Sequence, residues 1–267
     1  YLEGNSRLCV AEADEFDRSF LRMEPACGII TSIDSDHLDI YGDDATYRSA
    51  FETFREQVLG PCVVHSSTGL HGTTYGLYAG DHRAVNIRVD NGAYLFDWIG
   101  PGFRESVRFH QAGRHNLENA LAALALAAEM GMDPKELASG LRHFPGVRRR
   151  MDRIFSSDRH LYYDDYAHHP LELQALIEAM REWHPDKRLT LIFQPHLFSR
   201  TQWSGESPNE GFALAVNEVH KPGFLKIFQV SIIKLTVTKI FPFRTYIQPL
   251  EEWDHIVSLI VCRLVVW

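Results

Sequence analysis

Two acidic or basic side chains follow apolar segments near the start of the sequence. Glu12 follows "RLCVA", and His37 follows "ACGIITSIDSD". Side chains at the carboxyl ends of buried strands can converge on one ligand. A carboxylate, with an imidazole as a looser match, could hold a hard cation such as Mg²⁺ whose shell keeps waters and substrate phosphates. The alternative is that each residue is a solvated part of a turn, and spacing alone favours that interpretation for either residue taken singly.

The stretch "DDYAHHP" places Asp165, Tyr166, His168 and His169 ahead of a proline. Neighbouring side chains on an extended chain point to opposite sides, so the two histidines are not expected to chelate one metal. At most one of them faces a cleft. The later stretch "FQPHLFSRT" places further polar side chains at the end of the next expected strand, and both stretches could face the same cleft.

Two more clusters could meet a nucleotide. Asn116 and Asn119 in "GRHNLENALAA" are three residues apart at an expected helix start and would share a face. Amide side chains can pair with an adenine edge, but spacing alone favours the alternative that Asn116 only caps the helix and Asn119 is exposed. The run "GVRRRMDR" contains Arg149 and Arg150, whose guanidinium groups suit phosphate oxygens; a solvated basic linker is the alternative.

The elements around these residues predict an α/β protein. We expect "RLCVAEADE" and "ACGIITSIDSDH" to form buried strands, and a helix to follow a cap at Asp43 or Asp44. Residues 61–109 alternate in short runs that predict strands and hairpins, with Asn91–Gly92 as the hairpin turn. Alanine and leucine predict a long helix that ends near Gly131, and the next helix begins with Asp133 as its cap.

The stretch "FPGVRRR" predicts a linker, and a strand, a helix and a strand follow it: "RHLYYDDYA", "HPLELQALIEAMREWH" and "RLTLIFQPH". A βαβ unit implies parallel strands in a doubly wound sheet. We therefore expect one domain over residues 1–145 and a second over 146–267, with an atypical pattern after about 201. The final "IVSLIVCRLVVW" predicts a buried strand or an aggregation-prone end and is too short to anchor the chain in a membrane.

Composition narrows the classes of function. The chain has 267 residues, 45% of them hydrophobic, and a formal net charge of -8. That charge disfavours a general nucleic-acid binder. The cysteines, Cys9, Cys27, Cys62 and Cys262, are dispersed without a CxxC pair, which fits a reducing compartment and predicts a cytoplasmic protein. We expect neither nucleic acid nor membrane as a partner.

Taken together, the motifs "EADEFDRSF", "SIDSDHLDIYG", "GRHNLENALAA", "DDYAHHP" and "FQPHLFSRT" closely resemble the Mur ligases of peptidoglycan synthesis. The resemblance covers roughly residues 7–201. It implies a partial central ATP-binding domain joined to a Rossmann-like C-terminal domain. It also implies an ATP- and Mg²⁺-dependent (or Mn²⁺-dependent) ligation of L-alanine to UDP-N-acetylmuramate through an acyl phosphate.

The resemblance also assigns roles to residues of this sequence. Glu12 and His37 look like metal ligands. The catalytic side chains would be His37 with Arg149 and Arg150. Asn116, Asn119 and Asp165 would contact the nucleotide, Asp165 at the ribose or the hinge. The residues that match the amino-acid and muramyl end are Tyr166, His168, His196 and Arg200.

The sequence also departs from the family pattern. The family's UDP-binding domain is absent, and no GxxGK[ST] loop occurs. That loop cradles the phosphates and supplies a magnesium ligand, so we expect the isolated chain to be inactive. Leu197 stands where the family usually has an arginine. A tripeptide-recycling Mur ligase and a non-catalytic nucleotide-binding module are the alternatives.

Overall fold

A computed structural model describes residues 9–34, 38–157, 160–167, 170–193, 225–229 and 256–261. Contacts between residues divide the chain into two compact units. The first unit contains Tyr1–Asn86, Phe96–Ser106 and Glu118–Ser139, and the second contains Ile87–Leu95, Val107–Leu117 and Gly140–Trp267.

The N-terminal half of the chain builds a six-stranded sheet with the strand order β1-β2-β3-β4-β5-β6. Strands β1, β2, β3 and the start of β4 pair in parallel. The elements of this half are a 3₁₀ turn (Ser19–Arg22), β1 (Gly28–Ile30), α1 (Leu38–Tyr41), α2 (Asp44–Gln57), β2 (Cys62–His65), β3 (Thr73–Gly76), β4 (His82–Val89), β5 (Tyr94–Gly100), β6 (Phe103–Phe109), α3 (Arg114–Glu129) and α4 (Pro134–Leu141).

Local sequence signals set the ends of the helices. The Asp43 carboxylate accepts a hydrogen bond from the Thr46 backbone N–H at 2.7 Å and caps α2, as predicted. In the same way, Asp133 accepts from the Lys135 N–H at 2.9 Å, and Pro134 is the first residue of α4. Beyond α3, Gly131 adopts a φ of 88°, which confirms it as the C-terminal glycine of that helix.

Helix α2 and the first strands enclose the core of the first unit. Its buried Phe54 and Val58 belong to a cluster with Ile30, Cys62 and Val64. Phe20 joins this cluster from the 3₁₀ turn. Burial of these apolar side chains drives the packing of the helix on the sheet and holds the start and the end of β2 in place.

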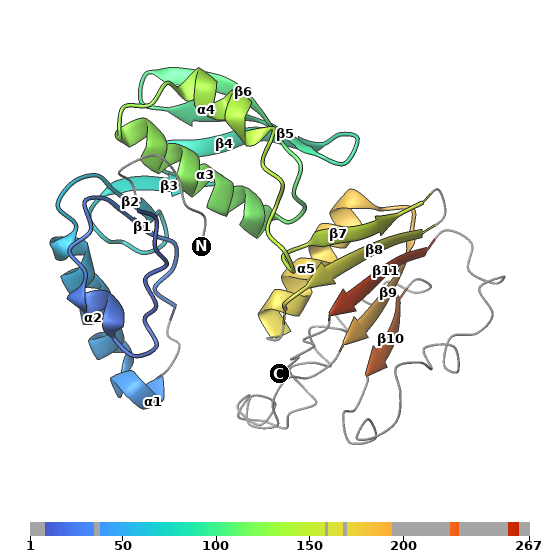
Figure 1. Cartoon of the computed structure of the whole chain (residues 1–267), viewed down its shortest axis with the longest axis horizontal. Coiled ribbons are helices and arrows are strands. Elements are labelled where there is room, and N and C mark those ends of the chain that lie inside the picture. Colours follow the sequence, from blue (N-terminus) through green and yellow to red (C-terminus); the bar gives the residue numbers. More distant parts are fainter. Residues whose placement is uncertain are drawn as a thin grey trace. The chain divides into compact units, whose positions relative to one another are not determined.

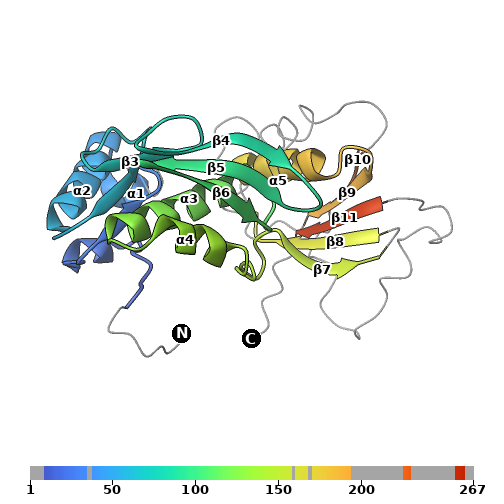
Figure 2. The ribbon, with the colours of Figure 1, turned by 90° about the horizontal axis from the view of Figure 1, so that it is seen from above.

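The second unit contains a five-stranded sheet with the order β10-β9-β11-β8-β7, which Figure 2 shows in that sequence. All pairs are parallel except β7 with β8. Its elements are β7 (Asp152–Ser156), β8 (His160–Asp165), α5 (Pro170–Trp183), β9 (Arg188–Phe193), β10 (Leu225–Gln229) and β11 (Ile256–Val261). The predicted βαβ unit is confirmed, with β11 between its two strands.

Helix α5 runs along one face of this sheet (Figure 1). Its Leu173, Ile177 and Met180 are at most 1% exposed and share an apolar cluster with Tyr163 of β8 and Leu191 of β9. The spacing of four and three residues along α5 places these side chains on one stripe, as amphipathic packing requires.

Several expectations about strands were wrong. The stretch 9–15 forms no strand, and Val10 is 97% exposed. An apolar run becomes a strand only where a neighbour accepts its hydrogen bonds, and none does so within the described residues. The hairpin at Asn91–Gly92 is confirmed by reciprocal Asp90–Ala93 backbone bonds of 2.9 and 3.1 Å. However, β2, β3 and β4 pair in parallel and form no hairpins with one another.

The contacts group residues 87–95 and 107–117 with the C-terminal unit, so the two compact units are not two uninterrupted segments. The boundary expected at residue 146 stays a prediction. None of the helices in the described ranges combines the length and the apolar character that crossing a bilayer requires.

Candidate functional site

The expected linker residues and the end of β8 form one cluster in the second unit. Asp165 is the last residue of β8 and only 5% exposed. One of its carboxylate oxygens accepts the Met151 backbone N–H at 2.7 Å, and the other accepts the Ala167 N–H at 2.8 Å. Burial raises the pKa of Asp165 although both N–H groups favour the ionised form. Asp165 therefore fixes the linker to the strand.

Arg149 extends along the same cluster. Its guanidinium lies 5.1 Å from the centre of the Tyr166 ring, and its Nε is 3.8 Å from an Asp164 carboxylate oxygen. The other Asp164 oxygen is buried without a hydrogen-bond partner among the described residues, and burial raises the pKa of that carboxyl. Arg149 has a φ of 60° and Met151 a φ of 51°, which turn the linker sharply at this point.

The residues before α3 reach the linker as well. The Gln111 side-chain nitrogen donates to the Arg150 carbonyl at 2.7 Å. Ala112 belongs to the apolar cluster of the second unit, together with Met151. The Asn116 side-chain nitrogen donates to the Ala112 carbonyl at 2.6 Å. The start of α3, the linker and the end of β8 thus hold one another through backbone groups.

Asn116 and Asn119 differ in their surroundings. Helix α3 begins at Arg114, so Asn116 lies inside the first turn and is not the cap that one interpretation expected. Its side chain is buried and turned back to Ala112, whereas Asn119 is exposed. The adenine contact stays a prediction for both.

A second set of contacts, also within the second unit, joins the first residue of α3 to α5. Arg114 places two nitrogens at 3.2 and 2.6 Å from one carboxylate oxygen of Glu182, and the Tyr94 hydroxyl donates to the other at 2.7 Å. Burial raises the pKa of Tyr94 and the Glu182 carboxylate adds to that effect, so the phenol stays protonated and able to donate. Trp183 contacts the Tyr94 ring edge-on, with centroids 5.5 Å apart.

The structure describes only one of the two expected metal ligands. Glu12 is exposed on an irregular segment of the first unit, and His37 lies outside the described residues. No group of three or more histidine, cysteine or acidic residues suited to a metal occurs within the part of the chain that the structure describes. The expected substrate residues His168, His196 and Arg200 also lie outside the described residues.

Sequence reasoning missed Gln111, which contacts the linker, and it missed Tyr94 and Glu182, which form the second connection with Arg114. Gln111 stands two residues before the "GRHN" motif, and its position beside that motif is the one signal that could have found it. Glu182 lies 68 positions from Arg114, and no sequence periodicity connects them.

The fold and the linked motifs define the class of protein. The Mur ligase middle-domain model matches residues 2–127, and the model of the Mur ligase glutamate ligase domain matches residues 149–207. Together these matches span more than half of the chain. The chain belongs to the Mur ligase family.

Two individual relatives are ligases of the same name. A UDP-N-acetylmuramate–L-alanine ligase of Christiangramia forsetii is 40% identical over 226 residues, which are 83% of this chain and 49% of that protein. The ligase of the same name from Flavobacterium psychrophilum is 44% identical over 199 residues, 72% of this chain and 44% of that protein. The chain therefore spans about half the length of the curated relatives it matches.

A solved structure agrees on the fold. The UDP-N-acetylmuramate–alanine ligase of Thermotoga maritima superposes with a TM-score of 0.71 at 23% identity, over 93% of this chain and 59% of that one.

Proposed function

We propose that this chain is part of an ATP-dependent ligase that joins L-alanine to UDP-N-acetylmuramate in peptidoglycan precursor synthesis. The observation that supports the proposal most directly is the 40% identity over 226 residues to a relative of that name. The reaction would proceed in the cytoplasm, and we expect neither nucleic acid nor membrane as a partner.

Amide formation requires a good leaving group on the muramyl carboxylate, whose own oxygen leaves poorly. The muramyl carboxylate would accept the terminal phosphoryl group of ATP, and ADP leaves. The neutral alanine amine would then attack the acyl carbon of the acyl phosphate, lose a proton and form the amide as phosphate leaves. Cations near the phosphate offset the charge that develops in transfer. Arg149 and Arg150 are the candidate cations, and the bonds of Asp165 and Gln111 to the linker backbone would hold them in place.

The nucleotide and the metal fit the described residues only in part. The Asn116 side chain is buried with its nitrogen bonded to the Ala112 carbonyl, whereas the Asn119 side chain is exposed. Both remain our candidates for the adenine contact. Glu12 supplies one exposed carboxylate. Mg²⁺ commonly takes one or two protein carboxylates and fills its shell with waters and phosphates, so Glu12 with His37 remains our proposal for its ligands.

Phosphate release with ATP, UDP-N-acetylmuramate and L-alanine tests this proposal. We expect release from a protein of the full length of the relatives and none from this chain, because the sequence contains no GxxGK[ST] loop. In the full-length protein, Arg149→Gln and Arg150→Gln should lower kcat, whereas Arg142→Gln, an exposed arginine outside the linker, should not. Release by the isolated chain would contradict the inference from the missing loop.

The acceptor is tested separately. A peptide-recycling ligase would prefer a tripeptide to L-alanine as acceptor, and a direct comparison of the two distinguishes these functions. Calorimetry of this chain with ATP and Mg²⁺ tests the remaining alternative, since tight binding without hydrolysis by the full-length protein would indicate a non-catalytic nucleotide-binding module.

A further inference from the structure

The first unit contains a hollow at the edge of its sheet opposite to the carboxyl ends of the strands. Its volume is about 590 Å³. Cys62 and Thr73, which line it, are the first residues of β2 and β3, and Asp81 directly precedes β4. Ligands of open parallel sheets usually bind at the carboxyl ends of the strands, and this hollow lies at the opposite edge.

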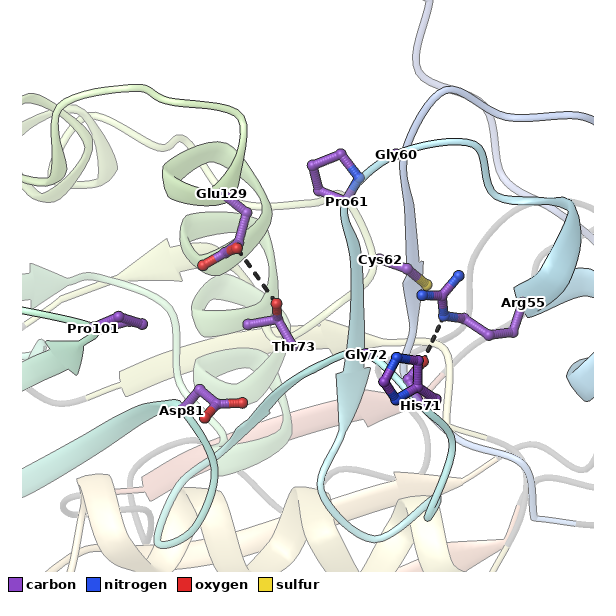
Figure 3. A pocket seen from close by; sticks show the side chains of 10 residues that line it. All are labelled: Arg55, Gly60, Pro61, Cys62, His71, Gly72, Thr73, Asp81, Pro101 and Glu129. Atoms are coloured by element: carbon purple, nitrogen blue, oxygen red, sulfur yellow. Dashed lines mark hydrogen bonds between the residues drawn. The ribbon is translucent and has the colours of Figure 1, made fainter.

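Charges of opposite sign line the two sides of the hollow (Figure 3). Arg55 comes from α2 and donates its Nε–H to the His71 carbonyl. Its two terminal nitrogens have no hydrogen-bond partner within the described part of the chain. Two carboxylates, Glu129 of α3 and Asp81, lie with the Thr73 hydroxyl on the other side, away from Arg55 (Figure 3).

A buried histidine fixes one of these carboxylates. His82 is fully buried, and its Nε2 lies 3.1 Å from a Glu129 carboxylate oxygen. Its Nδ1 lies 3.2 Å from Trp98 Nε1, an indole nitrogen that can only donate. Nδ1 must therefore accept, which leaves the ring proton on Nε2, where it is donated to Glu129. The second Glu129 oxygen is 3.4 Å from the Thr73 hydroxyl.

Asp81 is held in a similar way. One of its carboxylate oxygens accepts from the Thr74 N–H at 2.9 Å and from the Thr74 hydroxyl at 2.7 Å. These hydrogen bonds lower the pKa of Asp81 and keep it ionised, and no hydrogen bond is recorded for its other oxygen among the described residues. The hollow thus has two oriented carboxylates at one end and a guanidinium at the other.

We propose that this hollow binds a small zwitterion, with the carboxylate of the ligand at Arg55 and its primary ammonium group at Glu129 and Asp81. A metal ion is the less suitable occupant, because no group of three or more suitable side chains for a metal occurs within the described residues. An ammonium group needs only acceptors, and two carboxylates and a hydroxyl supply them. The inference does not depend on the ligase activity.

A series of ω-amino acids of increasing length tests the proposal on the chain itself. Glycine, γ-aminobutyrate and ε-aminocaproate are titrated while the ring signals of His71 and His82 are followed by NMR. The amine and the carboxylate of the same chain length, such as hexylamine and hexanoate for ε-aminocaproate, are the singly charged analogues of each probe. We expect saturable shifts with the zwitterion whose length spans the hollow. The singly charged analogue of that probe should bind about fivefold more weakly, the factor that one partly exposed ion pair supplies.

Variants assign the two ends. Arg55→Gln should reduce the affinity for the best zwitterion to that of the amine and leave binding of the amine unchanged. Glu129→Gln should reduce the affinity for the best zwitterion to that of the carboxylate analogue and leave binding of that carboxylate unchanged. Asp81→Asn is the second variant for the ammonium end should Glu129→Gln perturb His82. Arg22→Gln and Glu136→Gln remove exposed charges of the same unit outside the hollow and should change nothing.

The absence of saturable shifts with every probe would overturn the proposal. So would a zwitterion whose affinity is lowered equally by the pocket variants and by the two control variants, because the binding would then reflect net charge alone.

Discussion

Asp165 is the side chain on which the linker depends most. It accepts two backbone N–H groups in a buried position. We expect Asp165→Asn to lower the free energy of unfolding by about 1–3 kcal/mol, because an amide nitrogen must then face one of two N–H donors. Denaturation in urea measures the change, and hydrogen exchange at Met151 and Ala167 locates it.

Asp164→Asn is the matched control for that substitution, because Asp164 is adjacent, only partly buried and 3.8 Å from Arg149. A loss in Asp164→Asn as large as that in Asp165→Asn would show that the charge of the strand end matters, and not the two backbone bonds.

His184 gives the second unit a dependence on pH. Burial, with minor contributions from nearby cations, lowers the pKa of His184 to about 4, and its Nε2 lies 3.0 Å from the Tyr163 hydroxyl. In the unfolded chain the His184 ring titrates near its ordinary pKa of about 6.5. Between about pH 4 and pH 6.5 the unfolded state therefore binds more protons than the folded state. Stability should therefore be complete above about pH 6.5 and fall on the order of 2 kcal/mol as the pH drops towards 4.

Urea unfolding at about pH 7 and about pH 4.5 checks this dependence. His184→Phe removes the titrating ring and should reduce the loss, whereas His143→Phe, at an exposed histidine, should keep it. An unchanged loss in His184→Phe would assign the dependence to other groups.

Two glycines, one after the end of α3 and one within α4, should respond in opposite ways when replaced by alanine. Gly131 ends α3 with a φ of 88°, its N–H bonds the Ala128 carbonyl at 2.8 Å, and the next N–H, of Met132, bonds the Ala127 carbonyl at 3.1 Å. Gly131→Ala forces a side chain into the left-handed region and should destabilise by about 1 kcal/mol.

Gly140 lies within α4 without a positive φ and with open space where a side chain would be. Gly140→Ala should therefore stabilise by about 0.5–1 kcal/mol, because it restricts the unfolded chain and improves helix propensity. Thermal unfolding of both variants compares them directly. A stabilising Gly131→Ala would mean that α3 ends without this left-handed turn.

At the level of the whole molecule, segments distant in sequence should exchange hydrogen together. Residues 87–95 and 107–117 group with the C-terminal unit, and Glu182 bonds both Tyr94 and Arg114. We expect hydrogen exchange to show protection of these segments that follows α5. Glu182→Gln should lower the free energy of opening of these segments by about 1–3 kcal/mol, because the substitution weakens hydrogen bonds to a charged acceptor.

Glu178→Gln is the control on the same helix, because Glu178 is exposed and its recorded contact is a hydrogen bond from Gln174. Protection of residues 87–95 and 107–117 that is unaffected by Glu182→Gln would instead favour the uninterrupted domains predicted from the sequence, with their boundary near residue 146.

The sequence by itself determined the features that depend on near neighbours. The caps Asp43 and Asp133, the glycine Gly131 and the Asn91–Gly92 turn were predicted because each requires a backbone geometry set within a few residues. The family motifs were also readable, because residue type and spacing suffice to recognise them. The strand expected over "RLCVAEADE" does not form at its described residues 9–15, because a strand depends on a partner elsewhere in the chain.

Only the tertiary structure decided what each functional candidate contacts. The Asn116 side chain bonds the Ala112 carbonyl, Asp165 accepts the Met151 N–H of the linker, and Glu182 accepts from Arg114. The tertiary structure also placed β11 between β8 and β9, although β11 follows both in sequence. These contacts join residues far apart in the chain. Their formation depends on burial and hydrogen bonding across the whole fold, so the local periodicity of the sequence does not predict them.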